Sequence, residues 1–346
     1  MKKITKYGLS ALCGSLAAVS AAHAGELSVA GAGTMTYTSV SNAVTGNPFG
    51  MSTNITFTGS GELDGGQTFA LSIANDDKSV YSTASISLTT NSLGTFGLNQ
   101  GGGGKGIGGY DDKSPTAWEE SWGSGLSAGL DLPKGVSNST NLNWTSPKIA
   151  ATSLHVAYAP RNDGAQNNDK ATSGAISHKG YGYDVVLDMN PQFDVGGFNL
   201  YAGYSFTDLG GGSEQAQGKA RQDDHEEGVA GLILNVGPVT AGIQYMGEHL
   251  ASQVEGNVNY YGNNSWGVAF NVNDNLSVSY GETWSKKGFV DPSDNENPAR
   301  TEIEAINIAY TMGAASLKFA HAEMINGKYN TANDFDATTI ALSLAF

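Results

Sequence analysis

Apolar and polar residues alternate along most of this chain, in short segments separated by residues that favour turns. The segment at 335–346 shows the pattern clearly. Ile340, Leu342, Leu344 and Phe346 occupy every second position, so they would share one face of an extended strand. The small and polar residues between them would share the other face. This period of two predicts strands that are apolar on one face only.

Segments of this kind recur from residue 27 onward, and we count sixteen of them. The short connections carry residues typical of tight turns, and they centre on Gly65, Ser92, Lys148, Phe193, Gly237, Asp274 and Gly313. Long connections alternate with them at about 38–50, 100–138, 160–174, 207–225, 249–260, 285–300 and 324–334. The one exception is the second connection of this series, Asn75 to Ser79, which is short.

One segment, Ile176 to Met189, can be read as one strand or as two strands around Gly180. The lengths of the connections decide between these readings. A single strand keeps all tight turns at one end of the sheet, whereas two strands would move the later turns to the other end. Because bacterial barrels keep long loops and tight turns at opposite ends, we expect one strand.

The number and length of the segments predict an all-β fold, a sixteen-stranded antiparallel transmembrane β-barrel. Strands of about 9 to 11 residues span a bilayer when they are tilted. Aromatic residues near the predicted strand ends suit the two membrane interfaces: they are Tyr37, Trp144, Tyr158, Tyr204, Tyr245, Trp284 and Tyr310. Glu282 does not fit, because it would share the lipid-facing side with Tyr280. We expect it at the rim, on a bulge or in a subunit contact.

Residues 1–24 have the features of a secretory signal peptide. Three lysines precede an apolar run, and Ala22-His23-Ala24 is a small-residue cleavage pattern, so 25–346 would form the mature barrel. The only cysteine, Cys13, lies in this leader, which excludes a disulfide in the mature chain. The formal charge of −15 becomes −18 without the three lysines of the leader. A chain this acidic is a poor candidate for binding nucleic acid.

The sequence resembles the general-diffusion porins of Gram-negative bacteria, most nearly the sixteen-stranded porins of alphaproteobacteria. The resemblance covers the mature chain and is carried by GELSVAG at 25–31, LDGGQTF at 63–69, LGTFGL at 93–98 and the terminal Phe346. It implies a homotrimer in the outer membrane, in contact with lipid and lipopolysaccharide and inserted by the barrel-assembly machinery. Phe346 would be the residue that closes the barrel and signals assembly.

The same resemblance implies a water-filled pore for small hydrophilic solutes, narrowed by a third loop, about 100–138, that folds inward. No catalytic residue, cofactor or metal is expected in such a channel. The candidate constriction residues on this loop are Tyr110, Asp111, Asp112, Glu119 and Glu120. Their carboxylates would set a negative potential in the pore and favour cations.

The facing wall departs from the family pattern, in which early strands carry Arg or Lys. Between Lys6 and Lys78 the chain has neither residue, and the inward positions of the first four strands are Ser, Thr and Asn. By parity, Lys318 and His155 would also face the lumen. The missing basic wall favours cation preference over a transverse field.

Other readings remain open. A substrate-specific channel has the same sequence features as a general one. An outer-membrane hydrolase would need a nucleophile beside a rim histidine such as His225 or His249, and no motif joins them to one. A secreted β-rich surface protein could be extracted from the cells with water or salt, whereas a membrane barrel would need detergent. The acids Asp291, Asp294 and Glu296 lack the spacing of a calcium loop.

Overall fold

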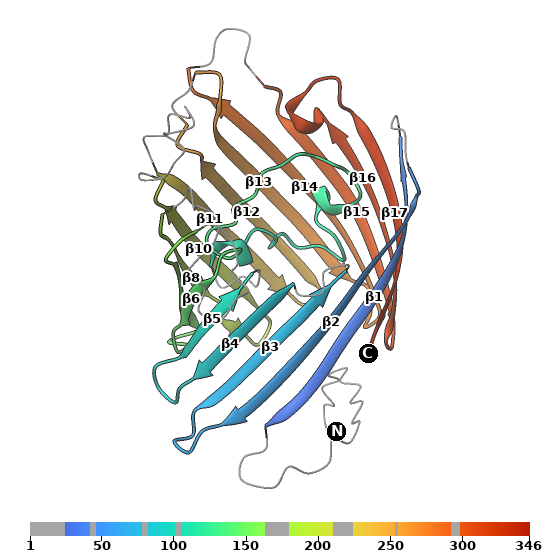
Figure 1. The fold of residues 1–346 in the computed structure, drawn as a ribbon. Coiled ribbons are helices and arrows are strands. Elements are labelled where there is room, and N and C mark those ends of the chain that lie inside the picture. Colours follow the sequence, from blue (N-terminus) through green and yellow to red (C-terminus); the bar gives the residue numbers. More distant parts are fainter. Residues whose placement is uncertain are drawn as a thin grey trace.

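The computed structural model describes residues 25–41, 46–77, 82–101, 106–162, 180–209, 224–252, 255–291 and 298–346. Their strands form one closed antiparallel sheet, in which strands that follow each other in sequence are paired, except that β8 and β9 both pair with β10, and β1 also pairs with β17 (Figure 1). The predicted signal peptide, 1–24, lies outside the described residues.

The first half of the barrel contains β1 (Glu26–Val40), β2 (Phe49–Glu62), β3 (Thr68–Asp76), β4 (Thr83–Thr89), β5 (Thr95–Gln100), β6 (Asn141–Thr145), β7 (Thr152–Ala159), β8 (Gly182–Met189) and β9 (Gln192–Phe193). The second half contains β10 (Gly196–Thr207), β11 (His225–Val236), β12 (Val239–His249), β13 (Val258–Asn271), β14 (Leu276–Phe289), β15 (Thr301–Met312), β16 (Ala315–Ile325) and β17 (Phe335–Ala345). Three short 3₁₀ turns complete the described elements: η1 (Ile107–Gly109), η2 (Ser121–Gly123) and η4 (Gly327–Tyr329).

β8 and β9 occupy one position in the barrel, because both pair with β10. Pro191 lies in the gap between them; it has no backbone N–H to donate to the ladder. With these two segments counted together the barrel has sixteen strands, as the sequence predicts. β8 has no break up to Met189, so the single strand expected there is confirmed for its described part, 182–189.

Tight turns gather at one end of the barrel, together with the start of β1 and the end of β17 (Figure 1). Two of them, between β11 and β12 and between β15 and β16, leave only two residues outside the strands. Gly237 and Gly313 in these turns have φ angles of 57° and 63°, which favour glycine. The longer connections lie at the opposite end.

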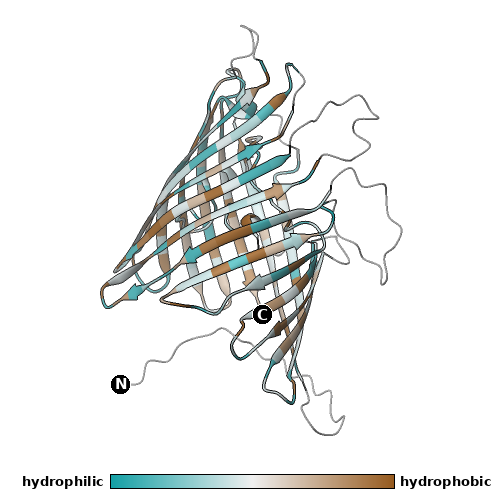
Figure 2. Cartoon of the chain, turned by 90° about the vertical axis from the view of Figure 1, so that its left-hand side faces the viewer, coloured by the Kyte–Doolittle hydropathy of each residue, from teal (hydrophilic) through white to brown (hydrophobic). Residues whose placement is uncertain are grey.

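The outer face of the barrel is apolar and its inner face is polar. Hydrophobic and hydrophilic residues alternate along the strands in Figure 2. On β15, Ile306 on the outer face is 50% exposed, whereas its inward neighbour Asn307 is 2% exposed. A water-soluble sheet protein would bury the apolar face instead, so this arrangement suits a barrel surrounded by lipid. Among the described residues, no helix is long and apolar enough to cross a membrane.

The barrel closes where β17 meets β1. The Phe346 amide donates to the Gly31 carbonyl at 2.9 Å, and the Gly31 amide donates to the Phe346 carbonyl at 3.0 Å. The Phe346 ring lies over Gly31, since a Cβ at residue 31 would be only 2.6 Å from its Cζ. Phe346 therefore occupies the last position of the closing pair of strands.

Glu282 lies on the outer face in the regular part of β14, opposite Trp266, so it does not sit on a bulge. Its carboxylate accepts hydrogen bonds from the Tyr280 hydroxyl at 2.6 Å and from Trp266 Nε1 at 3.2 Å. The Tyr280 hydroxyl also lies 2.5 Å from a carboxylate oxygen of Glu304, the partner of Glu282 on β15, so the two carboxylates share its single proton. Two donors thus compensate this carboxylate on a face where an unpaired charge is costly.

Candidate functional site

The described part of the long segment between β5 and β6, residues 106–140, runs along the inner surface of the barrel. Figure 1 shows it as the teal and green stretch inside the curve of the sheet. It carries η1 and η2 and is attached to the wall from β8 to β17. We call its described part, 106–140, the inner loop.

Inward polar side chains of the wall bind the middle of the inner loop. Gln244 on β12 accepts from the Lys113 amide at 3.0 Å, and Ser279 on β14 accepts from the Ala117 amide at 2.8 Å. Three further contacts extend this series along β13 to β15: Ser114 Oγ to Ser265 Oγ at 2.6 Å, Ser121 Oγ to Thr283 Oγ1 at 2.8 Å, and Asn307 Nδ2 to the Glu119 carbonyl at 3.0 Å. Each strand of this arc thus holds one part of the loop.

Two buried carboxylates hold the ends of the inner loop. Asp184 on β8 accepts hydrogen bonds from the amides of Ile107, at 3.0 Å, and Val136, at 3.2 Å. Glu227 on β11 accepts from the amides of Lys134, at 2.8 Å, and Gly135, at 2.9 Å. Bonds to an ionised acceptor are about twice as strong as neutral ones, so these contacts fix both ends against the wall.

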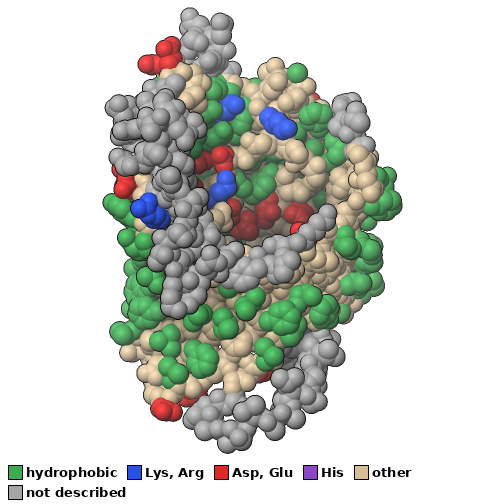
Figure 3. Space-filling view, viewed as in Figure 1, with side chains coloured by type: hydrophobic (Ala, Val, Ile, Leu, Met, Phe, Trp, Pro, Cys, Tyr) green, Lys and Arg blue, Asp and Glu red, His purple; other side chains and the backbone are tan. Residues whose placement is uncertain are grey.

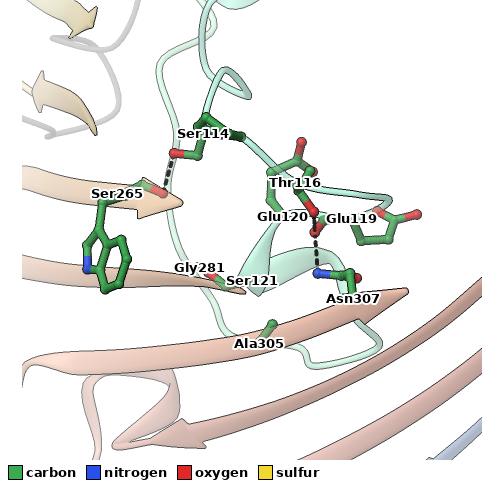
Figure 4. Close-up of a pocket in the computed structure, with 11 residues that line it drawn as sticks. Ser114, Thr116, Glu119, Glu120, Ser121, Ser265, Gly281, Ala305 and Asn307 are labelled. Carbon is green, nitrogen blue, oxygen red and sulfur yellow. Dashed lines mark hydrogen bonds between the residues drawn. The ribbon is translucent and has the colours of Figure 1, made fainter. Parts of the chain in front are cut away.

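The inner loop packs closely on the wall behind it. A Cβ at Gly267 would lie 2.3 Å from the Pro115 carbonyl oxygen, so this approach requires glycine. The cavity between loop and wall, drawn in Figure 4, has a volume of about 10 Å³. Because a single water needs roughly that much, this cavity is too small to hold a solute.

Four of the predicted constriction residues form one acidic cluster on the inner loop. Asp111, Asp112 and Glu119 each raise the pKa of Glu120 by their charge, in addition to the larger effect of burial, which places all four close together. In Figure 4 the Glu119 carboxylate points away from Asn307 on the wall. We call Asp111, Asp112, Glu119 and Glu120 the acidic cluster.

Partial burial raises the pKa values within the acidic cluster. Desolvation, followed by the charge of Asp112, raises the pKa of Asp111 to about 6. Desolvation also raises the pKa of Glu120 to about 7, and it raises the pKa of Glu119 against the opposing effect of Lys318. Asp112 is partly neutralised by Lys113, whose Nζ lies 2.9 Å from it. The cluster therefore carries less than its full formal charge at neutral pH.

Tyr110 and His155 lie together at the start of the inner loop, with their ring centroids 6.2 Å apart. The Tyr110 hydroxyl donates to Asp188 at 3.0 Å, and burial raises the pKa of this hydroxyl. His155 Nδ1 lies 3.1 Å from Thr145 Oγ1 on the neighbouring strand. The Tyr110 side chain thus connects the loop to β8.

Lys318 on β16 contacts the acidic part of the loop. Its Nζ lies 5.6 Å from the centre of the Trp118 ring, within the range of a cation–π contact. Its charge also lowers the pKa of Glu119. Lys318 therefore faces the lumen beside the acidic cluster.

The wall across the lumen carries few charges. The described residues from 25 to 101 include no Lys or Arg, and Lys78 lies outside the described residues. The sequence suggested a neutral wall of Ser, Thr and Asn, but the wall carries one acid. Asp76 at the end of β3 faces inward and accepts hydrogen bonds from Asn54 and Ser82. In Figure 3, Asp and Glu side chains lie in the hollow of the barrel.

Sequence reasoning did not single out the wall residues that hold the loop, above all Asp184, Glu227 and Gln244. Their parity does place them on inward positions, and Asp184 and Gln244 each lie between apolar outward neighbours, as with Asp184 between Tyr183 and Val185. Their partners lie 77, 93 and 131 positions away along the chain for the bonds of Ile107, Lys134 and Lys113. Alternation alone cannot reveal such partners.

Comparison with solved structures shows the same fold in several other proteins. OmpF of Salmonella typhi, in complex with daunomycin, is 14% identical with a TM-score of 0.66, over 93% of this chain and 98% of that chain. OprB of Pseudomonas putida is 10% identical with a TM-score of 0.64, over 93% and 94%. A mutant of the Rh. blastica porin is 15% identical with a TM-score of 0.56, over 93% and 100%.

A search of curated protein sequences finds no match. The family model for Gram-negative porins matches residues 8–346, nearly the whole chain. The apolar outer face and the closed barrel agree with this match, which supports an outer-membrane channel. The chain belongs to the Gram-negative porin family.

Proposed function

We propose that this porin is a cation-preferring diffusion channel for small hydrophilic solutes and ions, of the general type found among sixteen-stranded alphaproteobacterial porins. The observation that carries the proposal is the acidic cluster, which borders a lumen whose facing wall has no Lys or Arg among the described residues from 25 to 101. Tyr110, His155 and Lys318 complete the constriction that we propose.

The sign of the fixed charge sets the preference. A carboxylate attracts a monovalent cation by about 1 kcal/mol at 4 Å in water, and by more where protein displaces water. Lys113 and Lys318 reduce the negative potential without reversing it, because the four acids outnumber the two lysines beside them. Asp76 across the lumen adds to the same potential.

The proposed functional unit is a homotrimer in the outer membrane, bounded by lipid and lipopolysaccharide and inserted by the barrel-assembly machinery. The short strands β4 to β6 support this proposal. They make the barrel wall shorter on one side, and in a trimer the neighbouring protomers would cover that side. Export would require residues 1–24 as a signal peptide. In this proposal no nucleic acid, cofactor or catalytic residue takes part.

The test is the reversal potential of the purified protein in planar bilayers under a potassium chloride gradient. We expect cation preference, strongest in dilute salt because the screening length is about 10 Å at 0.1 M. Neutralising the acidic cluster with D111N, D112N, E119Q and E120Q should shift the reversal potential toward zero and change conductance in concentrated salt only modestly.

The matched control neutralises three acids of the tight turns, D64N, D194N and D274N, and should leave the preference unchanged. Anion preference in the unaltered protein would contradict the proposal. So would a reversal potential that the quadruple variant leaves where it was.

A further inference from the structure

A second cluster of ionisable side chains lies away from the acidic cluster, where β11 begins and β12 ends, at the end of the barrel that carries the longer connections. His225 and Glu227 are on the inward face of β11, and Glu248 is on the inward face of β12. A nitrogen of His225 and a carboxylate oxygen of each glutamate all lie within 4.8 Å of one another. The channel function above assigns no role to this group.

The two glutamates are a direct cross-strand pair. Glu227 is 5% exposed and Glu248 is 9% exposed, so two like charges face each other out of water. Like charges placed directly opposite are destabilising, and burial increases that cost. His225 Nε2 lies 2.9 Å from Glu248 Oε1, and it can balance at most one of the two charges. Lys134 is paired with Asp131 at 2.9 Å, so its charge, which also acts on Glu227 and Glu248 from a greater distance, is shared among three carboxylates.

One carboxylate oxygen of the cluster has no hydrogen-bond partner among the described residues. Glu248 Oε2 is buried and accepts no hydrogen bond among the described residues. Buried carboxylate oxygens are almost always satisfied, and an orphan acceptor carries a desolvation cost of about 1–3 kcal/mol or more. Glu227 uses both of its oxygens for the Lys134 and Gly135 amides, yet each oxygen keeps a second lone pair. A cation between the three side chains would satisfy all of these atoms.

We propose that His225, Glu227 and Glu248 bind a divalent transition metal of the zinc type. One imidazole nitrogen and two carboxylate oxygens are a donor set that zinc accepts, with water in a fourth position, whereas calcium and magnesium prefer oxygen alone. Tetrahedral bonds of about 2.1 Å place ligand atoms about 3.4 Å apart, so small rotations of these side chains complete the geometry. The His225 side chain, 14% exposed, offers the way in from solvent.

This site would join the barrel wall to the inner loop. Glu227 binds the amides of Lys134 and Gly135 directly, so a metal on Glu227 would fix the end of the loop through the same carboxylate. The pore would then exist in a metal-bound form with a more rigid loop end. Removal of the metal would leave the channel open and its loop end less firmly held.

The experiment uses the full-length detergent-solubilised protein, treated with EDTA and titrated with zinc chloride by isothermal calorimetry. We expect one saturable zinc site per protomer, which calcium and magnesium at the same concentration do not fill. The variants H225Q and E248Q should each weaken binding at least tenfold. H249A is the matched control, since His249 pairs with Glu226 on the opposite face, and it should bind zinc as the parent does.

Heat-modifiable migration on gels shows whether each variant is folded. X-ray absorption at the zinc edge of the parent protein gives a test that needs no variant. A first shell with one imidazole nitrogen and carboxylate oxygens supports the proposal. An absence of saturable zinc binding, equal affinity in E248Q and the parent, or a shell without imidazole would overturn it and leave a plain His225–Glu248 ion pair.

Discussion

Asp184 binds the backbone of Ile107: its Oδ2 accepts the Ile107 amide at 3.0 Å, and the same carboxylate also accepts the Val136 amide. Two points of the inner loop, 29 residues apart, are therefore held by one side chain of β8. Each bond to a charged acceptor contributes about 1.5–3 kcal/mol. We expect D184A to lower the free energy that holds the loop on the wall by roughly 3 kcal/mol.

The measurement for this variant is single-channel recording in planar bilayers. Current noise should rise and mean conductance should fall in D184A, because the loop can move away from the wall and into the open lumen. T56V on the opposite wall is the control and should record as the parent does. Currents in D184A that match the parent would show that Asp184 does not position the loop.

The raised pKa values in the acidic cluster predict a pH dependence of ion preference. A carboxyl group is negative above its pKa and neutral below it. Since the pKa of Glu120 is raised to about 7 and that of Asp111 to about 6, the cluster loses charge as pH falls from 8 to 5. Cation preference should therefore weaken over this window, well above the ordinary carboxyl range near 4.

Reversal potentials recorded at intervals between pH 8 and 4 check this expectation. E120Q should remove the upper part of the transition, near pH 7, and leave the part near pH 6. A preference that stays constant down to pH 5 would mean that the cluster is more hydrated than its burial indicates.

Contact between Gly267 and Pro115 predicts that a larger residue in the wall narrows the pore. A Cβ at Gly267 would lie 2.3 Å from the Pro115 oxygen, so in G267V the loop must move inward by at least about 1 Å to restore contact distance. Conductance should fall. The control is G262V on the same strand, where a Cβ meets nothing within 4 Å. Equal conductance in the two variants would count against this prediction.

Closure of the barrel depends on the fit between Gly31 and Phe346. Deleting Phe346 should abolish assembly, because the last pair of hydrogen bonds and the ring over Gly31 are lost. The change F346D should also abolish assembly, because a charged side chain replaces the ring. G31V should lower the yield of heat-modifiable protein, because the ring must leave its place. G33V is the matched control, since a Cβ at Gly33 meets nothing within 4 Å. Normal yields of F346D would refute the role of this residue.

Much of the fold could be predicted from the sequence because lipid on one side and water on the other impose a strict period of two. The alternation of Ile306, Asn307 and Ile308 is visible without a structure, and it matches their outward and inward positions. The break between β8 and β9 was not predicted, although Pro191 marks it. The alternation predicts which face of the sheet a residue occupies, but it does not show where the hydrogen bonds between two strands are interrupted.

The site was harder to predict, because its contacts join segments far apart in the chain. The acids of the inner loop could be named from the resemblance. Their raised pKa values depend on burial, which follows from how the loop lies on the wall. The role of Glu227 depends on the amides of Lys134 and Gly135, and no local pattern connects them.

The pairing of β1 with β17 also has a kinetic consequence. Thr34 and Ser343, joined by a 2.8 Å hydrogen bond between their side chains, are separated by 309 positions in the chain. Contacts of such long range form slowly, since the entropy of closing the loop is lost before the contact stabilises anything. Until β17 reaches β1, both strands have unpaired edges that invite aggregation. The yield of this barrel should therefore be limited by the rate of its final closure and not by the stability of the closed form.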